Sequence, residues 1–128
     1  MNIILDTHIF LWHITDDVKL KAKYKDIITD EANNIYLSAA SIWECIIKEQ
    51  IKKLIFPAPA SEYLTSKRVI HEISSLPIDE ESLSFLSTLP DLHRDPFDRI
   101  ILCQALKNGC NIITEDQILK KYPYQVFL

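Results

Sequence analysis

Four acidic side chains occupy positions where folded chains commonly build sites. They are Asp6, Glu44, Asp98 and Asp116. Asp6 directly follows the first apolar run of the chain, and Asp116 lies just past a later one. Asp98 lies in the first turn of a predicted helix, and Glu44 lies about two turns into another. Open parallel sheets bind ligands beyond the carboxyl ends of their strands, so we expect these acids near one site.

Converging carboxylates would need protons or metal ions. Each pair at about 5 Å and an effective dielectric of about 20 repels by about 3 kcal/mol. Oxygen-only ligand sets select hard cations, which predicts one or two Mg²⁺ or Mn²⁺ ions. We expect Asp6, Asp98 and Asp116 to bind metal, and Glu44 to hold a second ion or a water. The matching chemistry is phosphodiester hydrolysis by a metal-activated water.

Three of these acids also have a local structural interpretation. Asp6 and Asp116 could each cap the helix that begins just after them. Asp95 and Asp98 could cap the helix that starts at Pro96. Because Asp95 is the better cap, its oxygens would be used on backbone N–H groups, and Asp98 is the stronger site candidate.

Glu44 is harder to explain by local structure alone. Its helical neighbours are Ala40, Ile47 and Ile51, so it lies in an apolar stripe. The alternative is an ion pair with Lys48, four residues on, worth about 0.3 to 0.5 kcal/mol. A carboxylate that faces a bound cation also fits this stripe, so the spacing is compatible with both interpretations.

The overall charge predicts no broad phosphate-binding surface. The chain has 14 Lys and Arg against 18 Asp and Glu, a formal net charge of -4. Bound metal would therefore have to attract an anionic substrate. Several cations lie near the proposed acids in sequence, and each is also explained as a solvated side chain. They are Lys48, Lys52, Lys53, Arg94 and Arg99.

Other residue types exclude several classes of site. Gly109 is the only glycine, which excludes Gly-rich phosphate loops. The three cysteines form no C-x-x-C pair, and the four histidines show no H-x-x-x-H spacing, so no zinc site is predicted and the histidines are assigned no chemistry. Trp12 and Trp43 are expected to anchor a core.

Short apolar runs alternate with amphipathic segments, which predicts an α/β fold with a parallel sheet. Strands are expected at 2–5, 35–37, 73–77, 111–114 and 125–128. Helices are expected at 7–13, 19–32, 39–53, 60–72, 80–89, 96–108 and 115–121. Ser38 and Asp95 are the predicted N-caps, and Gly109 ends the helix that starts at Pro96.

Length and composition predict one globular domain over residues 1–128. The mass is 14.9 kDa, and 48% of residues are hydrophobic. No apolar run approaches the roughly 18 residues that span a bilayer, and no signal-peptide pattern follows Met1. We therefore expect a cytoplasmic protein without a membrane anchor.

Four segments together resemble a PIN domain of the VapC toxin type. They are Leu5-Asp6-Thr7-His8 with Leu11-Trp12, Ser41-Ile42-Trp43-Glu44, His93-Arg94-Asp95-Pro96-Phe97-Asp98-Arg99, and Thr114-Glu115-Asp116. The resemblance covers nearly the whole chain in the right order. It implies a three-layer fold with a short, mainly parallel central sheet flanked by helices. Two departures are that residues 50–54 lack a glycine common in the family, and that Cys103 replaces a usual alanine.

The resemblance implies a Mg²⁺- or Mn²⁺-dependent endoribonuclease that is the toxin of a type II toxin–antitoxin pair. RNA would be its substrate and a cognate antitoxin its partner, and such toxins are usually homodimers. Asp6, Glu44, Asp98 and Asp116 match the acidic quartet of the family. Supporting roles around that quartet are expected for Thr7, Asp95, Arg99 and Thr114.

Two other functions are compatible with the same residues. A non-catalytic protein-interaction domain would use the acids only as caps. An aspartyl-phosphate phosphatase would use Asp6 as nucleophile, but its usual D-x-D pattern is broken by His8.

Overall fold

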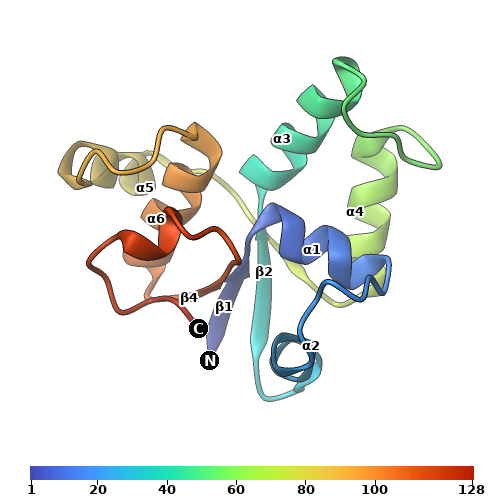
Figure 1. Ribbon diagram of the computed structural model, residues 1–128, viewed down its shortest axis with the longest axis horizontal. Helices are drawn as coiled ribbons and strands as arrows, with labels where there is room; N and C mark the ends of the chain where they lie inside the picture. The colour runs from blue at the N-terminus through green and yellow to red at the C-terminus, as the bar shows by residue number, and fades with distance from the viewer.

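Four short parallel strands form the centre of the molecule in the computed structural model, which describes residues 1–128 (Figure 1). The strands are β1 (Asn2–Leu5), β2 (Asn34–Ser38), β3 (Ser74–Leu76) and β4 (Asn111–Ile113). Their order across the sheet is β3-β2-β1-β4, and every pairing is parallel. The predicted parallel sheet is confirmed, with β2 and β1 as its two inner strands.

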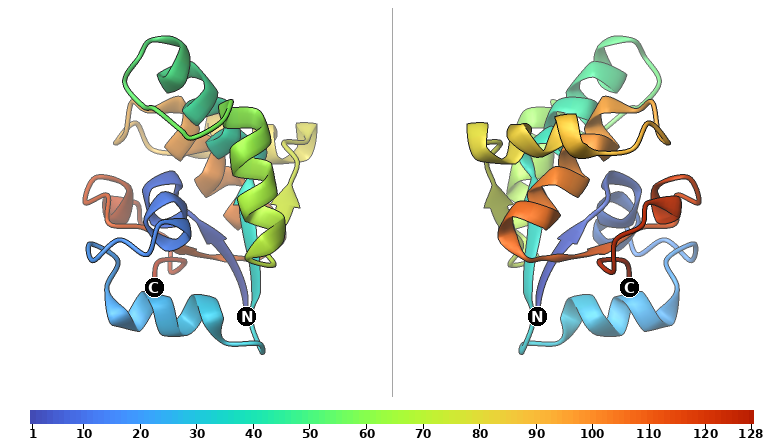
Figure 2. Two further views of the ribbon diagram at one scale, coloured as in Figure 1. Left: turned by 90° about the vertical axis from the view of Figure 1, so that its right-hand side faces the viewer. Right: turned by 90° about the vertical axis from the view of Figure 1, so that its left-hand side faces the viewer.

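Helices cover both faces of this sheet (Figures 1 and 2). The α-helices are α1 (Thr7–Ile14), α2 (Ala22–Thr29), α3 (Ala39–Gln50), α4 (Ala60–Ile70), α5 (Glu80–Ser84) and α6 (Pro96–Asn108). Alternate residues of β1 enter two separate cores, as the two-residue period of a strand requires. Ile3 and Leu5 pack with α1 to α4, whereas Ile4 packs with α6 and the C-terminal segment. The three-layer α/β fold is thereby confirmed.

The strand register aligns the carboxyl ends of β2, β1 and β4. Leu5 lies opposite Leu37 of β2 and Ile113 of β4. The residues that follow, Asp6 and Thr114, are therefore neighbours at one edge of the sheet. This alignment positions the candidate site.

Several helices begin and end where their caps predict. Ser38 caps α3 by accepting the Ala40 N–H, and Asp95 caps α6 by accepting the Phe97 N–H. Gly109 ends α6 in the left-handed conformation, with φ of 64°. These signals act locally, which is why the sequence locates them well.

Three helices end on left-handed residues that are not glycine. They are Asp16, Lys52 and Glu72, with φ of 50°, 61° and 57°. After α3, the Lys52 N–H donates to the Glu49 carbonyl at 3.0 Å and the Lys53 N–H to the Lys48 carbonyl at 2.8 Å. This is a Schellman motif, and it ends the helix at Gln50 instead of the predicted residue 53. Lys52 thus takes a glycine-like conformation within the segment that lacks the family glycine.

Trp43 lies on the side of α3 that faces out of the fold, and it is 53% exposed. The expectation that Trp43 anchors a core is therefore wrong.

Four further predicted elements are wrong in extent or type. The helix expected at 19–32 is only Ala22–Thr29, and the one expected at 80–89 becomes α5 followed by the 3-10 turn Phe85–Thr88. Residues 115–121 form no α-helix, because the Asp116 side chain binds the amides of an open turn, and only the 3-10 turn Leu119–Lys121 follows. The strand expected at 125–128 is reduced to a single bridge between Ile112 and Phe127. None of the helices combines the length and apolar character needed to cross a bilayer.

Candidate functional site

Asp6 joins the end of β1 to the start of α1. Its Oδ1 accepts the Thr7 N–H at 2.6 Å, so the predicted capping role exists. Its Oδ2 accepts a hydrogen bond from the Thr114 hydroxyl at 2.7 Å. Each carboxylate oxygen has two lone pairs, so Asp6 retains acceptor capacity after both bonds. Capping and ligand binding are therefore compatible at this residue.

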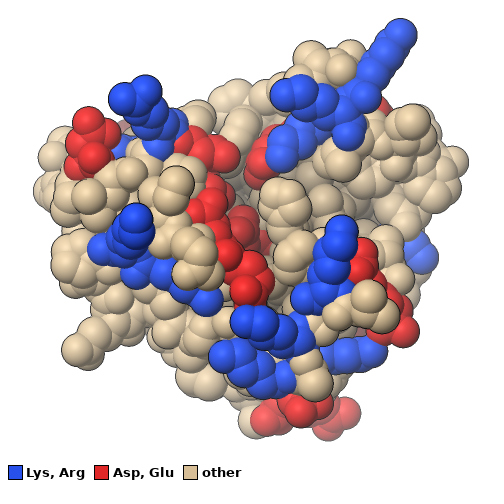
Figure 3. Space-filling view, viewed as in Figure 1, with Lys and Arg blue, Asp and Glu red and all other residues tan.

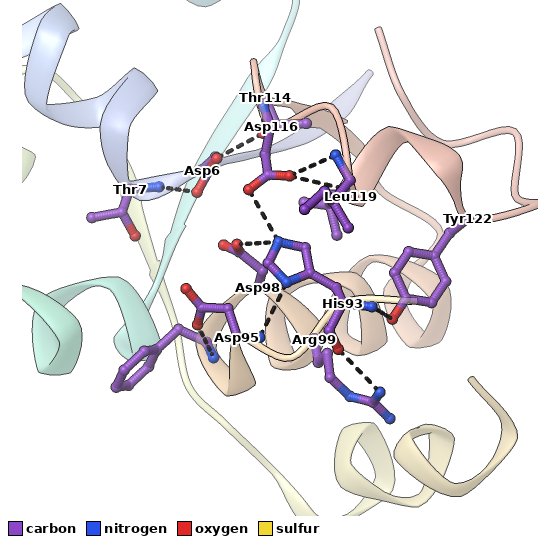
Figure 4. A network of polar contacts seen from close by, with 12 residues as sticks. Asp6, Thr7, His93, Asp95, Asp98, Arg99, Thr114, Asp116, Leu119 and Tyr122 are labelled. Atoms are coloured by element: carbon purple, nitrogen blue, oxygen red, sulfur yellow. Dashed lines mark hydrogen bonds and ion pairs between the residues drawn. The ribbon is translucent and has the colours of Figure 1, made fainter. Parts of the chain in front are cut away.

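Asp95 caps α6, and Asp98 does not. The Asp95 side chain accepts the Phe97 N–H at 2.9 Å. Asp98, one turn further, is only 7% exposed and turns toward the sheet edge (Figure 4). The carboxylate that is not used for capping is thus the one that faces Asp6 and Asp116.

Asp116 has one oxygen held locally and one directed into the site. Its Oδ1 accepts the N–H groups of Ile118 and Leu119, both at 2.9 Å. Its own N–H donates to the Thr114 hydroxyl oxygen at 3.0 Å. The Thr114 hydroxyl therefore links Asp116 to Asp6, and the Asp116 Oδ2 remains free to face other side chains.

His93 is the site residue that sequence reasoning missed. Its Nε2 lies 3.0 Å from Asp116 Oδ2 and 3.1 Å from Asp98 Oδ2 (Figure 4). Its Nδ1 accepts the Asp95 N–H at 3.1 Å, which places the ring proton on Nε2. The prediction that the histidines carry no chemistry, which rested on the absence of H-x-x-x-H spacing, does not hold for His93. His93 lies in one short segment with Asp95 and Asp98, and this proximity is the sequence signal for it.

The loop that carries His93 is held in place by two further side chains. The Tyr122 hydroxyl oxygen accepts the His93 N–H at 3.1 Å. The Arg99 guanidinium donates to the carbonyls of His93 and Leu86 at 3.4 and 3.3 Å. Arg99 therefore braces this loop and does not point at the carboxylates.

Glu44 lies beside this group and is joined to it through Thr7. The Thr7 hydroxyl donates to Glu44 Oε1 at 2.7 Å, and Ser41 Oγ lies 2.9 Å from the same hydroxyl. Glu44 is only 6% exposed, and its Oε2 pairs with Lys48 Nζ at 2.8 Å. The ion pair that the spacing allowed is present, although the carboxylate is buried and not on an open helix surface.

We call Asp6, Glu44, Asp98 and Asp116 the acidic site. Ligand atoms of Asp98, Asp116 and His93 all lie within 4.8 Å of one another, a spacing that one metal ion could bridge. In the space-filling view, a band of acidic side chains follows a hollow down this face, with Lys and Arg side chains on both sides (Figure 3). The chain thus concentrates negative charge in one groove.

Burial and mutual repulsion perturb these carboxyl groups. Burial, followed by the negative charges of Asp6, Asp95, Asp116 and Glu44, raises the pKa of Asp98 from 3.8 to about 8. Burial also raises the pKa of Asp6, against hydrogen bonds from Thr114 and Thr7 that lower it. For Asp116, burial would raise the pKa, but hydrogen bonds from His93 and two backbone amides outweigh it and hold the pKa below its usual value.

The charge and donor set fit a divalent cation. A metal ion would replace the proton that Asp98 holds and would neutralise the surrounding carboxylates. Carboxylate oxygens suit Mg²⁺ and Mn²⁺, and an imidazole beside them favours a transition metal such as Mn²⁺. The arrangement can therefore hold a cation and present it to an anionic ligand in the groove.

Comparison with known proteins agrees with this architecture. The family model described as PIN domain matches residues 3–123. The chain superposes on the crystal structure of VapBC2 from Rickettsia felis bound to a promoter DNA fragment, with TM-score 0.70, 16% identity, and coverage of 100% of this chain and 98% of that one. DNA-bound VapBC from Salmonella typhimurium gives TM-score 0.69, 14% identity and coverage of 100% and 97%. The crystal structure of FitAcB from Neisseria gonorrhoeae gives TM-score 0.58 and 18% identity, with coverage of 91% of this chain and 89% of that one. No curated protein sequence matches the chain significantly.

Proposed function

Because the chain belongs to the PIN domain family, we propose that it is a metal-dependent endoribonuclease of the VapC type, the toxin of a type II toxin–antitoxin pair. The match to VapBC and FitAcB folds supports the toxin assignment. By the same proposal, the chain is one domain that acts in the cytoplasm, binds a cognate antitoxin and forms a homodimer.

The observation that carries the proposal is the convergence of acids from separate segments. Asp6 follows β1, Glu44 lies on α3, Asp98 lies on α6 and Asp116 follows β4. Repulsion among these acids at the carboxyl end of the sheet destabilises the fold unless protons or bound cations neutralise the charge. Strongly perturbed carboxyl groups in a groove are typical of functional sites.

The proposed ligands are Asp6, Asp98 and Asp116, with Mg²⁺ or Mn²⁺ as the cation. When bound, one or two such ions would lower the pKa of a water and neutralise negative charge on the phosphodiester. Thr114 orients Asp6 and positions Asp116, and His93 holds the oxygens of Asp98 and Asp116 in fixed directions. Glu44, fixed by Thr7 and Lys48, would hold a second ion or a water.

A cleavage assay tests this proposal. Single-stranded RNA should be cut in Mg²⁺ or Mn²⁺ and left intact in excess EDTA. Asp98→Asn should lose at least about 100-fold in rate, since changes even to residues behind a metal ligand cost 10- to 100-fold. Asp26→Asn is the matched control, because Asp26 is exposed on α2. Full activity in EDTA or in Asp98→Asn would refute the assignment.

A non-catalytic interaction domain is the second candidate. It is favoured by the local bonds of Asp6 and Asp116, each of which accepts backbone N–H groups beside it. Under this alternative, no RNA is cleaved with either metal, although the protein is folded.

A further inference from the structure

Two histidines from separate helices meet in a part of the molecule away from the acidic site. His13 lies in the last turn of α1, and His71 directly follows α4 (Figure 1). Their ring centroids are 4.9 Å apart, and the ring planes are inclined at 64°. The absence of H-x-x-x-H spacing argues against a zinc site on one helix, but it does not exclude a site made by two helices.

Both rings line a hollow of about 490 Å³ that shares no residue with the acidic site. Its wall includes Ile35, near the start of β2, whereas the acidic site lies past the carboxyl ends of the strands. The volume lies in the range of small-ligand sites, roughly 300 to 1,000 Å³. The hollow can therefore hold a metal ion with its bound waters.

The rings of this pair lack hydrogen-bond partners within the protein. His13 Nδ1 is buried and makes no hydrogen bond. His93 is the only histidine whose ring nitrogens take part in hydrogen bonds or ion pairs. A buried polar atom without a partner is rare in folded proteins, and binding of an ion is one explanation for it.

Negative charge surrounds the hollow, and no Lys or Arg lines it. The acidic residues of the lining are Asp30, Glu31 and Glu72. Burial, followed by the charges of His71 and Lys25, lowers the pKa of His13, so this ring is neutral near pH 7. A neutral imidazole has a lone pair available for a metal ion, and the carboxylates attract the cation.

The separation of the two rings fits imidazoles that share one metal ion. With zinc–nitrogen bonds of about 2.0 to 2.1 Å, two such ring centres are about 4.5 Å apart at a right angle and about 5.2 Å apart at the tetrahedral angle. The observed 4.9 Å lies between these values. Aromatic packing alone permits about 4.5 to 7 Å, so the unpartnered nitrogen and the surrounding carboxylates decide in favour of a metal.

The end of α4 brings a carboxylate beside the pair. Glu72 has φ of 57°, its N–H donates to the Val69 carbonyl at 3.0 Å, and the Ile73 N–H donates to the Arg68 carbonyl at 2.9 Å. This Schellman motif turns the chain sharply after the helix. As a result, the consecutive residues His71 and Glu72 both line the hollow.

We propose that His13, His71 and Glu72 bind a Zn²⁺ ion at this hollow, at a site separate from the acidic site. Two imidazoles and a carboxylate suit Zn²⁺, whereas Mg²⁺ prefers oxygen ligands. A water takes the fourth position, as in other zinc sites with three protein ligands. The ion joins the end of α1 to the end of α4 and stabilises the folded state by mass action. The inference is independent of the proposed nuclease function, because the two sites share no residue.

Zn²⁺ binding to the protein that carries Asp98→Asn tests the site, because this change removes a donor from the acidic site. Calorimetry should show a Zn²⁺ equivalent that Asp98→Asn retains. In the unmodified chain, the NMR signals of the His13 and His71 rings should shift with Zn²⁺ and should not shift with Mg²⁺. The ring signals identify the ligands directly, whatever happens to stability.

Further variants in this background identify the ligands by affinity. His13→Gln and His71→Gln should each weaken Zn²⁺ binding by at least about 10- to 100-fold, the loss found even for residues behind a metal ligand. Glu72→Gln should weaken it as well, and because Glu72 is exposed, this variant keeps the test decisive if a histidine variant fails to fold. His8→Gln and Glu62→Gln are the matched controls on α1 and α4. Both residues are exposed and lie outside the hollow, so both variants should bind Zn²⁺ like the parent protein.

Two results would overturn the zinc site. One is the absence of saturable Zn²⁺ binding in Asp98→Asn, or equal affinity in His71→Gln and His8→Gln. The other is a shift of the His93 ring signals with Zn²⁺ while those of His13 and His71 stay unchanged. Zn²⁺ then binds only at the acidic site, and the histidine pair is an ordinary aromatic contact. Loss of RNA cleavage without loss of this Zn²⁺ equivalent bears only on the nuclease proposal.

Discussion

The Nε2 of His93 lies 3.0 Å from the Oδ2 of Asp116. The Nδ1 of the same ring accepts the Asp95 N–H, so the ring proton is on Nε2 and points toward Asp116. The same Nε2 is 3.1 Å from Asp98. In the absence of metal, His93 is thus the one hydrogen-bond donor that lies between these two carboxylates. This role explains how closely spaced acids stay ordered.

Replacing His93 should destabilise the metal-free protein. We expect His93→Gln to lower the free energy of unfolding in EDTA by about 1.5 to 3 kcal/mol, the range for a hydrogen bond to a charged group. The loss should be smaller in saturating Mg²⁺, because the cation supplies positive charge in the same place. Urea unfolding with and without metal measures both, and His71→Gln, at a half-buried histidine on the far end of α4, is the control. An equal loss in both conditions would show that His93 acts only through packing.

The Thr114 hydroxyl should matter more than its size suggests, because it joins two acids. Thr114→Val keeps the volume but removes the bonds to Asp6 and to the Asp116 N–H. We expect stability to fall by about 1 to 3 kcal/mol. Mn²⁺ affinity, measured by calorimetry, should fall by about 10- to 100-fold. Thr65→Val, at a hydroxyl bonded only within its own helix, should leave Mn²⁺ affinity unchanged. Unaltered affinity in Thr114→Val would contradict a metal at Asp6 and Asp116.

Metal-free stability should fall as the pH rises from about 4 toward 8. The pKa of Asp98 is raised from 3.8 to about 8, so the folded state keeps a proton that the unfolded chain loses near pH 4. The stabilisation is complete below pH 3.8 and is lost as the pH passes through the folded value, with a slope of up to about 1.4 kcal/mol per pH unit. The pKa of Asp6 is also raised, so Asp6 contributes to the same loss of stability with rising pH. The pKa of Asp116 is lowered, so this group changes the stability only below about pH 3.8.

Urea unfolding in EDTA across this pH range provides the measurement. Asp98→Asn carries no titrating group at that position, so its stability should depend much less on pH. If the original chain and Asp98→Asn show parallel profiles, the proton is not on Asp98.

Divalent metal should raise the melting temperature at neutral pH. A cation that binds only the folded state stabilises it by about 2.7 kcal/mol at 100 times its Kd. We expect a clear rise in Tm with millimolar Mg²⁺ or Mn²⁺, lost in Asp98→Asn and retained in Asp26→Asn. The absence of any rise in the unmodified chain would favour the non-catalytic alternative.

Lys52→Gly should stabilise the protein. Lys52 has φ of 61°, where a side chain costs about 1 to 2 kcal/mol and glycine costs none. Glycine also makes the unfolded chain more flexible, which removes about 0.5 to 1 kcal/mol of that gain. We expect a net rise of about 0.5 to 1 kcal/mol in the free energy of unfolding. Ser66→Gly, inside α4, should lower it instead, and a loss in both variants would rule out strain at Lys52.

The sequence by itself determined the features that depend on neighbouring residues. These local features are strand β1, the Asp95 cap, Pro96 at the first position of α6 and the Gly109 stop. The family motifs also identified the four acids as candidates. Local signals suffice there because caps and turns are made by residues two to four positions apart.

Only the tertiary structure decided which side chains meet. His93 reaches Asp116, and Thr114 reaches Asp6, across 23 and 108 positions of the chain. The exposure of Trp43 and the loss of a final strand likewise depend on which face each segment turns to its neighbours. The physical reason is that strand register and helix packing set the distances between these side chains. Both depend on contacts between residues far apart in the sequence, and a local sequence pattern does not specify such contacts.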